Sequence, residues 1–233
     1  MKETEEENYS RFSLPKAGSL PNDRLPALGL LRLVAKVISI VFHPLAMPTY
    51  TFAILFFLAQ NFSMLDPDQN LKILGFIAIL TGVLPAVLSA MFFIREGESL
   101  SMEDRSRRVY PFLLTAFIYV CIAYLFRVLL QSHYNMQLLM NCIACSALLS
   151  AIITLRWKIS THAMGAAGMT GALAATLIIM GDERIFVPLT LSIVLWGLVC
   201  SSRLLLNAHT TAQIVAGSIA GCGITFGLLF LYL

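Results

Sequence analysis

Basic residues and histidines gather in three short polar segments that separate long apolar runs of the sequence. We call residues 95–111, 156–162 and 201–213 the first, second and third polar segments. Arginine and lysine bind anions, and the planar fork of arginine donates two parallel hydrogen bonds to a phosphate. Histidine can move a proton, because its imidazole titrates near neutral pH. The combination predicts a site that binds an anion and acts on it.

The candidate site residues come from all three segments. They are Arg105, Arg108, Lys158, Ser160, His162, Arg203, His209 and Gln213, with Asp104 as the nearest acidic partner. Arg105 and Arg108 are neighbours on a helical turn because they are three residues apart. A basic belt flanking a membrane is the alternative interpretation, but such a belt has no use for the two histidines.

The amino-acid composition indicates the class of protein that carries these residues. Of 233 residues, 58% are hydrophobic and 12% charged, whereas soluble domains have about 45–50% apolar and about 25% charged residues. So little charge cannot cover a water-facing surface, which excludes a soluble enzyme, a disordered chain and a disulfide scaffold. The net charge of +3 is too small to indicate nucleic-acid binding.

Seven apolar runs are long enough, or nearly so, to cross a hydrocarbon core about 30 Å thick. Lipid offers no partner for backbone amides, so each run is expected to be helical. The sequence therefore predicts an all-α, polytopic transmembrane bundle with six or seven spans. The runs are 45–61, 71–94, 111–130, 136–156, 162–180, 185–202 and 209–232.

The N-terminal part has a different character. Residues 1–27 are polar and acidic and lack the order of an export signal, which predicts a disordered tail. In residues 28–43, Arg32 and Lys36 share one helical face opposite an apolar one, which is typical of a helix lying in the membrane interface. Residues 44–233 would then form the transmembrane domain.

His43 precedes Pro44 at the bend into the first apolar run. An interfacial kink residue is the favoured interpretation of His43, and a part in chemistry stays open.

The number of spans between the polar segments places all three on one side of the membrane. Two runs separate the first segment from the second, and two more separate the second from the third. All but three of the 16 basic residues lie on this side, the exceptions being Lys72, Arg127 and Arg184. The positive-inside rule then predicts that the site faces the cytoplasm, with the N-terminal tail, in a prokaryotic cytoplasmic membrane. If residues 28–42 crossed the membrane, the site would face outward.

Cysteine and glycine patterns are expected to serve packing. Cys142 and Cys145 lie inside an apolar run, without partner ligands at zinc-site spacing. Gly217 and Gly221 form a GxxxG pattern, which allows two helices to approach closely. We expect no metal site.

The third polar segment carries the most specific pattern. It reads Ser202-Arg203, five residues, then His209. This pattern resembles the last signature of the type 2 phosphatidic-acid phosphatase superfamily, which is Ser-Arg, any five residues, His, any three residues and Asp. Gln213 stands where that signature has its aspartate.

The other two segments are similar to the remaining signatures of the superfamily. Ser160-Thr161-His162 resembles Pro-Ser-Gly-His, although Ile159 replaces the proline and Thr161 the glycine. The arginine-rich first segment, ending at Pro111, resembles Lys, any six residues and Arg-Pro, but it lacks the lysine. The resemblance covers roughly residues 45–230 and implies the superfamily's helical fold.

The resemblance also implies a reaction, which is phosphoryl transfer through a phosphohistidine without metal or other cofactor. His209 would attack the phosphorus, and His162 would protonate the leaving oxygen and later deprotonate water. Gln213 would orient His209. Because Gln213 carries no charge, a carboxylate from elsewhere would have to supply it, and Asp104 and Glu103 are the nearest candidates. The implied phosphate-binding residues are Arg203, Lys158, Arg105, Arg108 and Ser160.

Together these observations predict an integral-membrane lipid phosphatase acting on a lipid phosphomonoester or pyrophosphate. His162 and His209 each open a long apolar run, which would hold them at the depth of a lipid headgroup. The alternative is a weak or inactive protein that binds or carries a lipid phosphate, because Gln213 carries no charge. A transporter of another solute ranks last, since the span centres are largely apolar.

Overall fold

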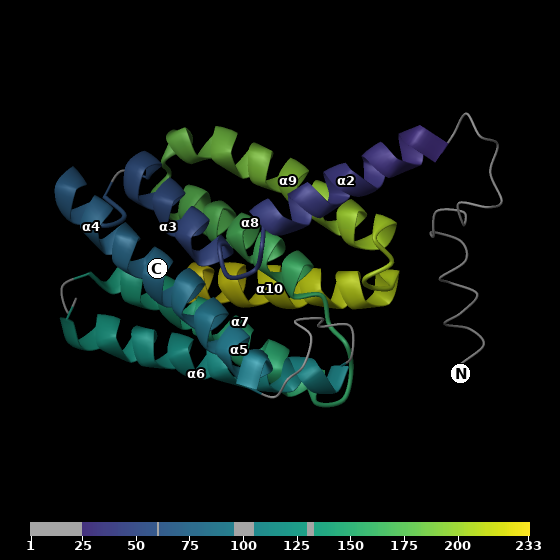
Figure 1. Ribbon diagram of the computed structural model, residues 1–233. Coiled ribbons are helices and arrows are strands. Elements are labelled where there is room, and N and C mark those ends of the chain that lie inside the picture. Colours follow the sequence, from purple (N-terminus) through teal and green to yellow (C-terminus); the bar gives the residue numbers. More distant parts are fainter. Residues whose placement is uncertain (1–24, 60, 96–104, 130–132) are drawn as a thin grey trace.

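The computed structural model describes residues 25–59, 61–95, 105–129 and 133–233, and these ranges are helical with short connections and no strand (Figure 1). The all-α bundle that the composition predicts is therefore confirmed. The segments are α2 (Leu25–Val41), α3 (Met47–Leu58), α4 (Pro67–Ile77), π-helical η3 (Ala78–Val83), α5 (Leu84–Arg95), α6 (Arg105–Leu129), α7 (Tyr134–Thr154), α8 (Thr161–Met180), 3-10 helix η4 (Glu183–Ile185), α9 (Phe186–Leu205) and α10 (Thr211–Tyr232).

Six helices in the described ranges are long and apolar enough to cross a membrane. They are Pro67–Phe92, Val109–Leu129, Tyr134–Thr154, Thr161–Met180, Glu183–Leu205 and Thr211–Tyr232. A seventh full span over residues 45–61 is not found, because α3 has only 12 residues and is about 18 Å long. The protein is a multi-pass membrane protein.

The predicted helix over residues 28–43 is present as α2, which ends at Val41. Its place in a membrane interface stays a prediction. Residues 1–24, most of the expected disordered tail, lie outside the part of the chain that the structure describes.

The span Pro67–Phe92 contains the π-helical segment η3, which ends two residues before Pro85. Proline has no N–H, so the Thr81 carbonyl four residues earlier cannot accept the usual helical hydrogen bond from it. The hydroxyl of Tyr119 on α6 donates to that carbonyl at 2.8 Å. The irregular turn is thus tied to the neighbouring span.

Helix α8 occupies the centre of the bundle and packs most extensively against α10. A Cβ at Gly217 would lie 2.5 Å from the Ser160 carbonyl oxygen, and one at Gly221 would clash with the backbone of Met164. The GxxxG pattern is therefore the surface where α10 touches α8, as its spacing predicts.

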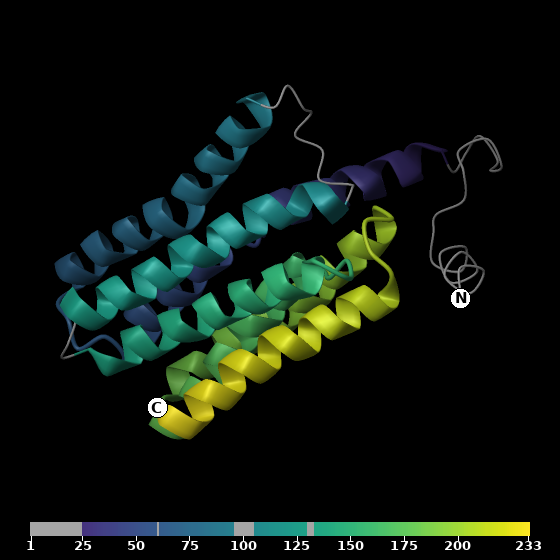
Figure 2. The same cartoon turned by 90° about the horizontal axis from the view of Figure 1, so that it is seen from below.

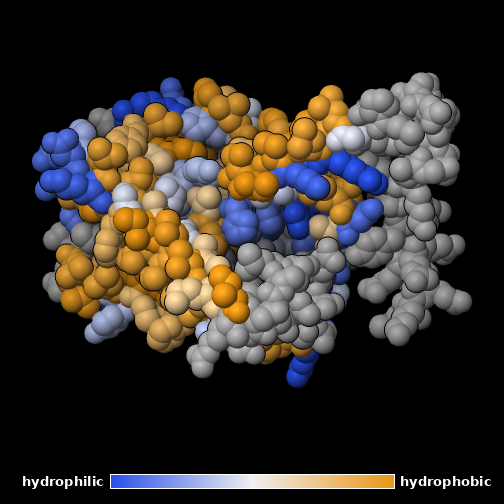
Figure 3. Space-filling model, in the orientation of Figure 1, coloured by the Kyte–Doolittle hydropathy of each residue, from blue (hydrophilic) through white to orange (hydrophobic). Residues whose placement is uncertain are grey.

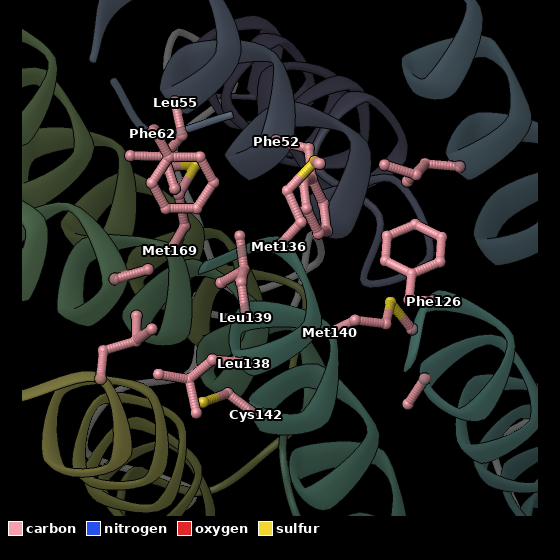
Figure 4. Close-up of a cluster of buried hydrophobic side chains, with 14 of the residues drawn as sticks. Phe52, Leu55, Phe62, Phe126, Met136, Leu138, Leu139, Met140, Cys142 and Met169 are labelled. Carbon is pink, nitrogen blue, oxygen red and sulfur yellow. The ribbon is translucent and has the colours of Figure 1, made fainter. Parts of the chain in front are cut away.

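Large apolar side chains fill the space between α3, α6, α7 and α8 (Figure 4). Phe52, Phe126, Leu139 and Met140 are among the most buried, and Cys142 lies among them as a packing residue. Apolar side chains also cover much of the surface, as expected for lipid-facing helices (Figure 3). No cluster of potential metal ligands occurs in the described ranges.

Candidate functional site

Residues from all three polar segments line one cavity of about 470 Å³ at one end of the bundle. The starts of α8 and α10 and the end of α9 lie at this end in two perpendicular views (Figures 1 and 2). The lining includes Pro111 of the first segment, His162 of the second, and Arg203 and His209 of the third. The described residues of the three segments that line the cavity thus share one end of the bundle, as the parity of the spans predicts.

His209 is buried in the connection between α9 and α10, and the start of α10 orients its ring. Its Nδ1 lies 3.0 Å from Oε1 of Gln213, and the backbone N–H of Thr210 donates to the same oxygen at 3.3 Å. Because Oε1 only accepts, Nδ1 of His209 is the donor and Nε2 carries the lone pair of the ring. This is the tautomer that nucleophilic attack through Nε2 requires.

The local sequence explains why Gln213 reaches His209. Thr210 caps α10, and its hydroxyl accepts a hydrogen bond from the backbone N–H of Gln213 at 3.3 Å. The glutamine side chain returns toward the Thr210 backbone, so the two residues form a capping box. The same amide oxygen therefore serves helix capping and ring orientation.

His162 lies in the first turn of α8, where Ser160 caps the helix. Its Nε2 donates to the Ser39 carbonyl of α2 at 3.1 Å, which leaves Nδ1 as the nitrogen that can exchange a proton. The ring also lies within electrostatic range of Arg203 and His209.

Arg203 lies in the last turn of α9, where the negative end of the helix dipole favours a cation. The adjacent Ser202 fixes this end of α9 against α2, because its hydroxyl lies 3.2 Å from that of Ser39. Arg203 supplies the positive charge on the cavity wall among the described residues.

His43 lies at the bend between α2 and α3, and its side chain also reaches the cavity. Its ring stands edge-on to that of His162, with 5.4 Å between the centroids, and it lines the cavity. The bend at Pro44 therefore brings a third histidine to the site. The isolated His-Pro pair at the end of an apolar helix was the available sequence signal.

Two predicted phosphate-binding residues are not among the described residues of the cavity wall. Ser160 is fully buried, and its hydroxyl accepts from the backbone N–H of Ala163 at 3.4 Å, so it caps α8. Lys158 is half-buried in the connection that precedes α8. Capping of α8 occupies the Ser160 hydroxyl at the start of that helix.

Three further candidates fall partly or wholly outside the described residues. Arg105 and Arg108 are in the first turn of α6, but their side chains are not described, and neither is Asp104. Their roles stay predictions.

The cavity continues from its polar residues into the apolar interior of the bundle. Its wall is predominantly hydrocarbon away from Arg203 and the histidines, with a few hydroxyls. The apolar lining residues include Phe112, Leu139, Ile143, Met169 and Ala172. A ligand with a polar head and an apolar tail fits this distribution of side chains.

Comparison of the chain with protein-family models, curated proteins and solved structures gives no match. The resemblance to the phosphatase superfamily therefore depends on the three short motifs alone.

The arrangement is equipped to bind a phosphate and to react with it. Arg203 can hold phosphate oxygens, His209 presents Nε2 as a nucleophile, and His162 can transfer a proton at Nδ1. A guanidinium on the cavity wall favours an anionic ligand over a neutral one. These features are the basis of the following proposal.

Proposed function

We propose that the protein is a membrane phosphatase that removes phosphate from a lipid phosphomonoester or pyrophosphate. The observation that carries the proposal is the orientation of His209 by Gln213 on the same cavity wall as Arg203 and His162. The apolar continuation of that cavity favours a lipid over a water-soluble phosphate.

The reaction proceeds in two transfers. Nε2 of His209 attacks the phosphorus and the bond to the leaving oxygen breaks. His162 enters this step as the imidazolium, which the bound phosphate stabilises, and it gives the leaving oxygen its Nδ1 proton. His162 then takes a proton from water, whose oxygen attacks the phosphohistidine and releases inorganic phosphate and His209. Arg203 stabilises the negative charge on the phosphoryl oxygens in both steps.

Most of the basic residues lie on the same side of the membrane as the three polar segments. By the positive-inside rule, this distribution favours a site on the cytoplasmic side of a prokaryotic cytoplasmic membrane. On that side the substrate would be a lipid phosphate of the inner leaflet. Its phosphate and its hydrocarbon chain would occupy the polar and apolar parts of the cavity, respectively.

A lipid-phosphate binder or carrier is the second candidate, and one observation favours it. The group at Nδ1 of His209 is a neutral amide rather than a carboxylate. An uncharged partner orients the ring but stabilises the imidazolium less, and the comparable replacement in serine proteases costs about 10⁴ in rate.

Phosphate release from a long-chain lipid phosphomonoester by the purified protein, with a chelator present, tests the proposal. We expect turnover by the wild type and a loss of about 10³-fold or more in His209→Ala, because that variant has no nucleophile. His133→Ala is the matched control, since His133 directly precedes α7, which begins at the opposite end of the bundle (Figure 2). Equal release by His209→Ala would contradict the phosphatase, and lipid-phosphate binding without release would support the binder.

A further inference from the structure

The proposed reaction leaves two ionisable residues of the described cavity wall unused, His43 and Tyr119. Of these, His43 is the one beside His162. The backbone N–H of Leu45 donates to its Nδ1 at 3.3 Å. Nδ1 therefore carries the lone pair, and the ring proton of the neutral imidazole is on Nε2. Because the two nitrogens are on different sides of the ring, this N–H donor is directed away from the Leu45 amide.

The neighbours of His43 favour the neutral form. His162 of α8, Arg203 of α9 and His209 before α10 line the same cavity, and no carboxylate belongs to its described wall. A second proton would add positive charge near Arg203 and would break the hydrogen bond from Leu45. Partial burial, followed by the charge of Arg203, lowers the pKa of His43 below its ordinary value of 6.5.

We propose that His43 is a further phosphate-binding residue, whose neutral imidazole donates its Nε2–H to a phosphoryl oxygen. Arg203 supplies the charge, and His43 adds a directional donor that needs no protonation. The inference rests on the phosphate site of the proposed function, and it extends the site to the bend between α2 and α3. It does not require that the bound phosphate be hydrolysed.

Two substitutions distinguish the effect of the His43 N–H donor from the effect of its aromatic ring. His43→Gln keeps an uncharged N–H donor near the position of Nε2, whereas His43→Phe keeps an aromatic ring against His162 and removes the donor. The probe is a long-chain alkylphosphonate, in which a P–C bond prevents hydrolysis. Its dissociation constant is measured for the wild type and both variants, together with the pH profile of hydrolysis of a lipid phosphomonoester.

We expect His43→Gln to bind the phosphonate within about threefold of the wild type and to keep its pH profile. His43→Phe should bind about 10- to 100-fold more weakly, because a hydrogen bond to a charged group contributes about 1.5–3 kcal/mol. His133→Phe is the control for the same replacement outside the cavity. His43→Leu replaces His43→Phe if thermal unfolding shows that the latter does not fold.

Binding by His43→Phe that equals the wild type would overturn the inference, and so would an absence of phosphonate binding by the wild type. An equal loss in both variants, with one limb of the pH profile missing, would show that His43 titrates and is not a neutral donor. Binding without hydrolysis by the wild type would end the phosphatase proposal alone, since the phosphonate affinities would still test His43.

Discussion

At the scale of single residues, the pairing of His209 with Gln213 determines how the histidine ring is oriented in the cavity wall. The amide oxygen of Gln213 holds Nδ1 of His209 at 3.0 Å and so selects the tautomer with the lone pair on Nε2. It provides orientation without charge. In the proposed reaction the attack would produce a positively charged imidazole, which a carboxylate would stabilise more than an amide does.

This difference predicts that Gln213→Glu hydrolyses a lipid phosphomonoester faster than the wild type. A glutamate has nearly the shape of glutamine, keeps the capping box with Thr210, and places negative charge at the positive end of α10. We expect kcat to rise by about tenfold or more, because a hydrogen bond to a charged group contributes about 1.5–3 kcal/mol.

Gln213→Met is the matched control for this test, since it keeps the length of the side chain and loses the acceptor. Its kcat should fall below that of the wild type. Steady-state phosphate release measures both variants, and a glutamate variant that is slower than the wild type would argue against positive charge developing on His209.

At the scale of helices, the position of His162 depends on the contact between α8 and α10. Gly217 approaches the Ser160 carbonyl, and Gly221 approaches the backbone of Met164. Thr225 adds a hydrogen bond from α10 to the Gly168 carbonyl of α8 at 2.8 Å. These contacts hold the first turn of α8, and hence His162, beside the start of α10.

A methyl group at Gly221 should therefore disturb both the bundle and the site. In Gly221→Ala the new Cβ would meet the Met164 backbone, so α8 and α10 must separate. We expect a loss of stability of about 1–3 kcal/mol and a lower kcat. Thermal unfolding in detergent and phosphate release measure the two effects.

Gly223→Ala is the control on the same helix, because nothing lies within 4 Å of its added Cβ. Alanine favours helix over glycine, so this variant should be as stable as the wild type or more so. Equal behaviour of the two variants would show that the α8–α10 contact is not tight.

At the scale of the whole molecule, one cavity joins a polar end of the bundle to its apolar interior. Described residues of the three polar segments line it at the polar end, while α6, α7 and α8 contribute apolar wall residues. A substrate chain inside the bundle would let the protein select lipids by the shape of the chain as well as by the phosphate.

A larger side chain in the apolar part of the cavity should therefore slow hydrolysis of long-chain substrates more than that of short-chain ones. Ile143→Trp adds bulk to the cavity wall, and we expect it to lower kcat/KM for a long-chain lipid phosphate by about tenfold or more. Hydrolysis of a short-chain, water-soluble phosphate monoester should change little. The comparison requires both substrates at the same detergent concentration.

Val194→Trp provides the control, because Val194 is 57% exposed on α9 and is not among the cavity-lining residues. It should leave both substrates unaffected. A parallel decrease for the two substrates in Ile143→Trp would exclude a chain in this part of the cavity.

The side of the membrane that the site faces is also a property of the whole molecule. Trp157→Cys lies in the connection between α7 and α8, at the end that holds the site, and Asp68→Cys lies at the start of α4. If the site faces the cytoplasm, a membrane-impermeant maleimide should label Asp68→Cys in intact cells and Trp157→Cys only after permeabilisation. The wild type controls for its native cysteines, and the reverse labelling would place the site outside.

The amino-acid sequence by itself determined the helical membrane class and the positions of the six long spans. Hydrocarbon imposes these features locally, since each span must be apolar, long and internally hydrogen-bonded. The motif around His209 and the parity of the spans also indicated which polar segments share one end of the bundle. The apolar run over residues 45–61 did not reveal that α3 is too short to cross a membrane. The ends of α3 are set by the local turns on either side of it, and the apolar run extends beyond them.

Only the tertiary structure decided which side chains reach the cavity. Ser39 and His162 are 123 residues apart and meet because α2 packs against α9, which lies beside α8. The same packing brings His43 to the wall, whereas capping of α8 holds Ser160 away from it. Such contacts depend on how separate helices lie against one another, and no local pattern of residues encodes that arrangement.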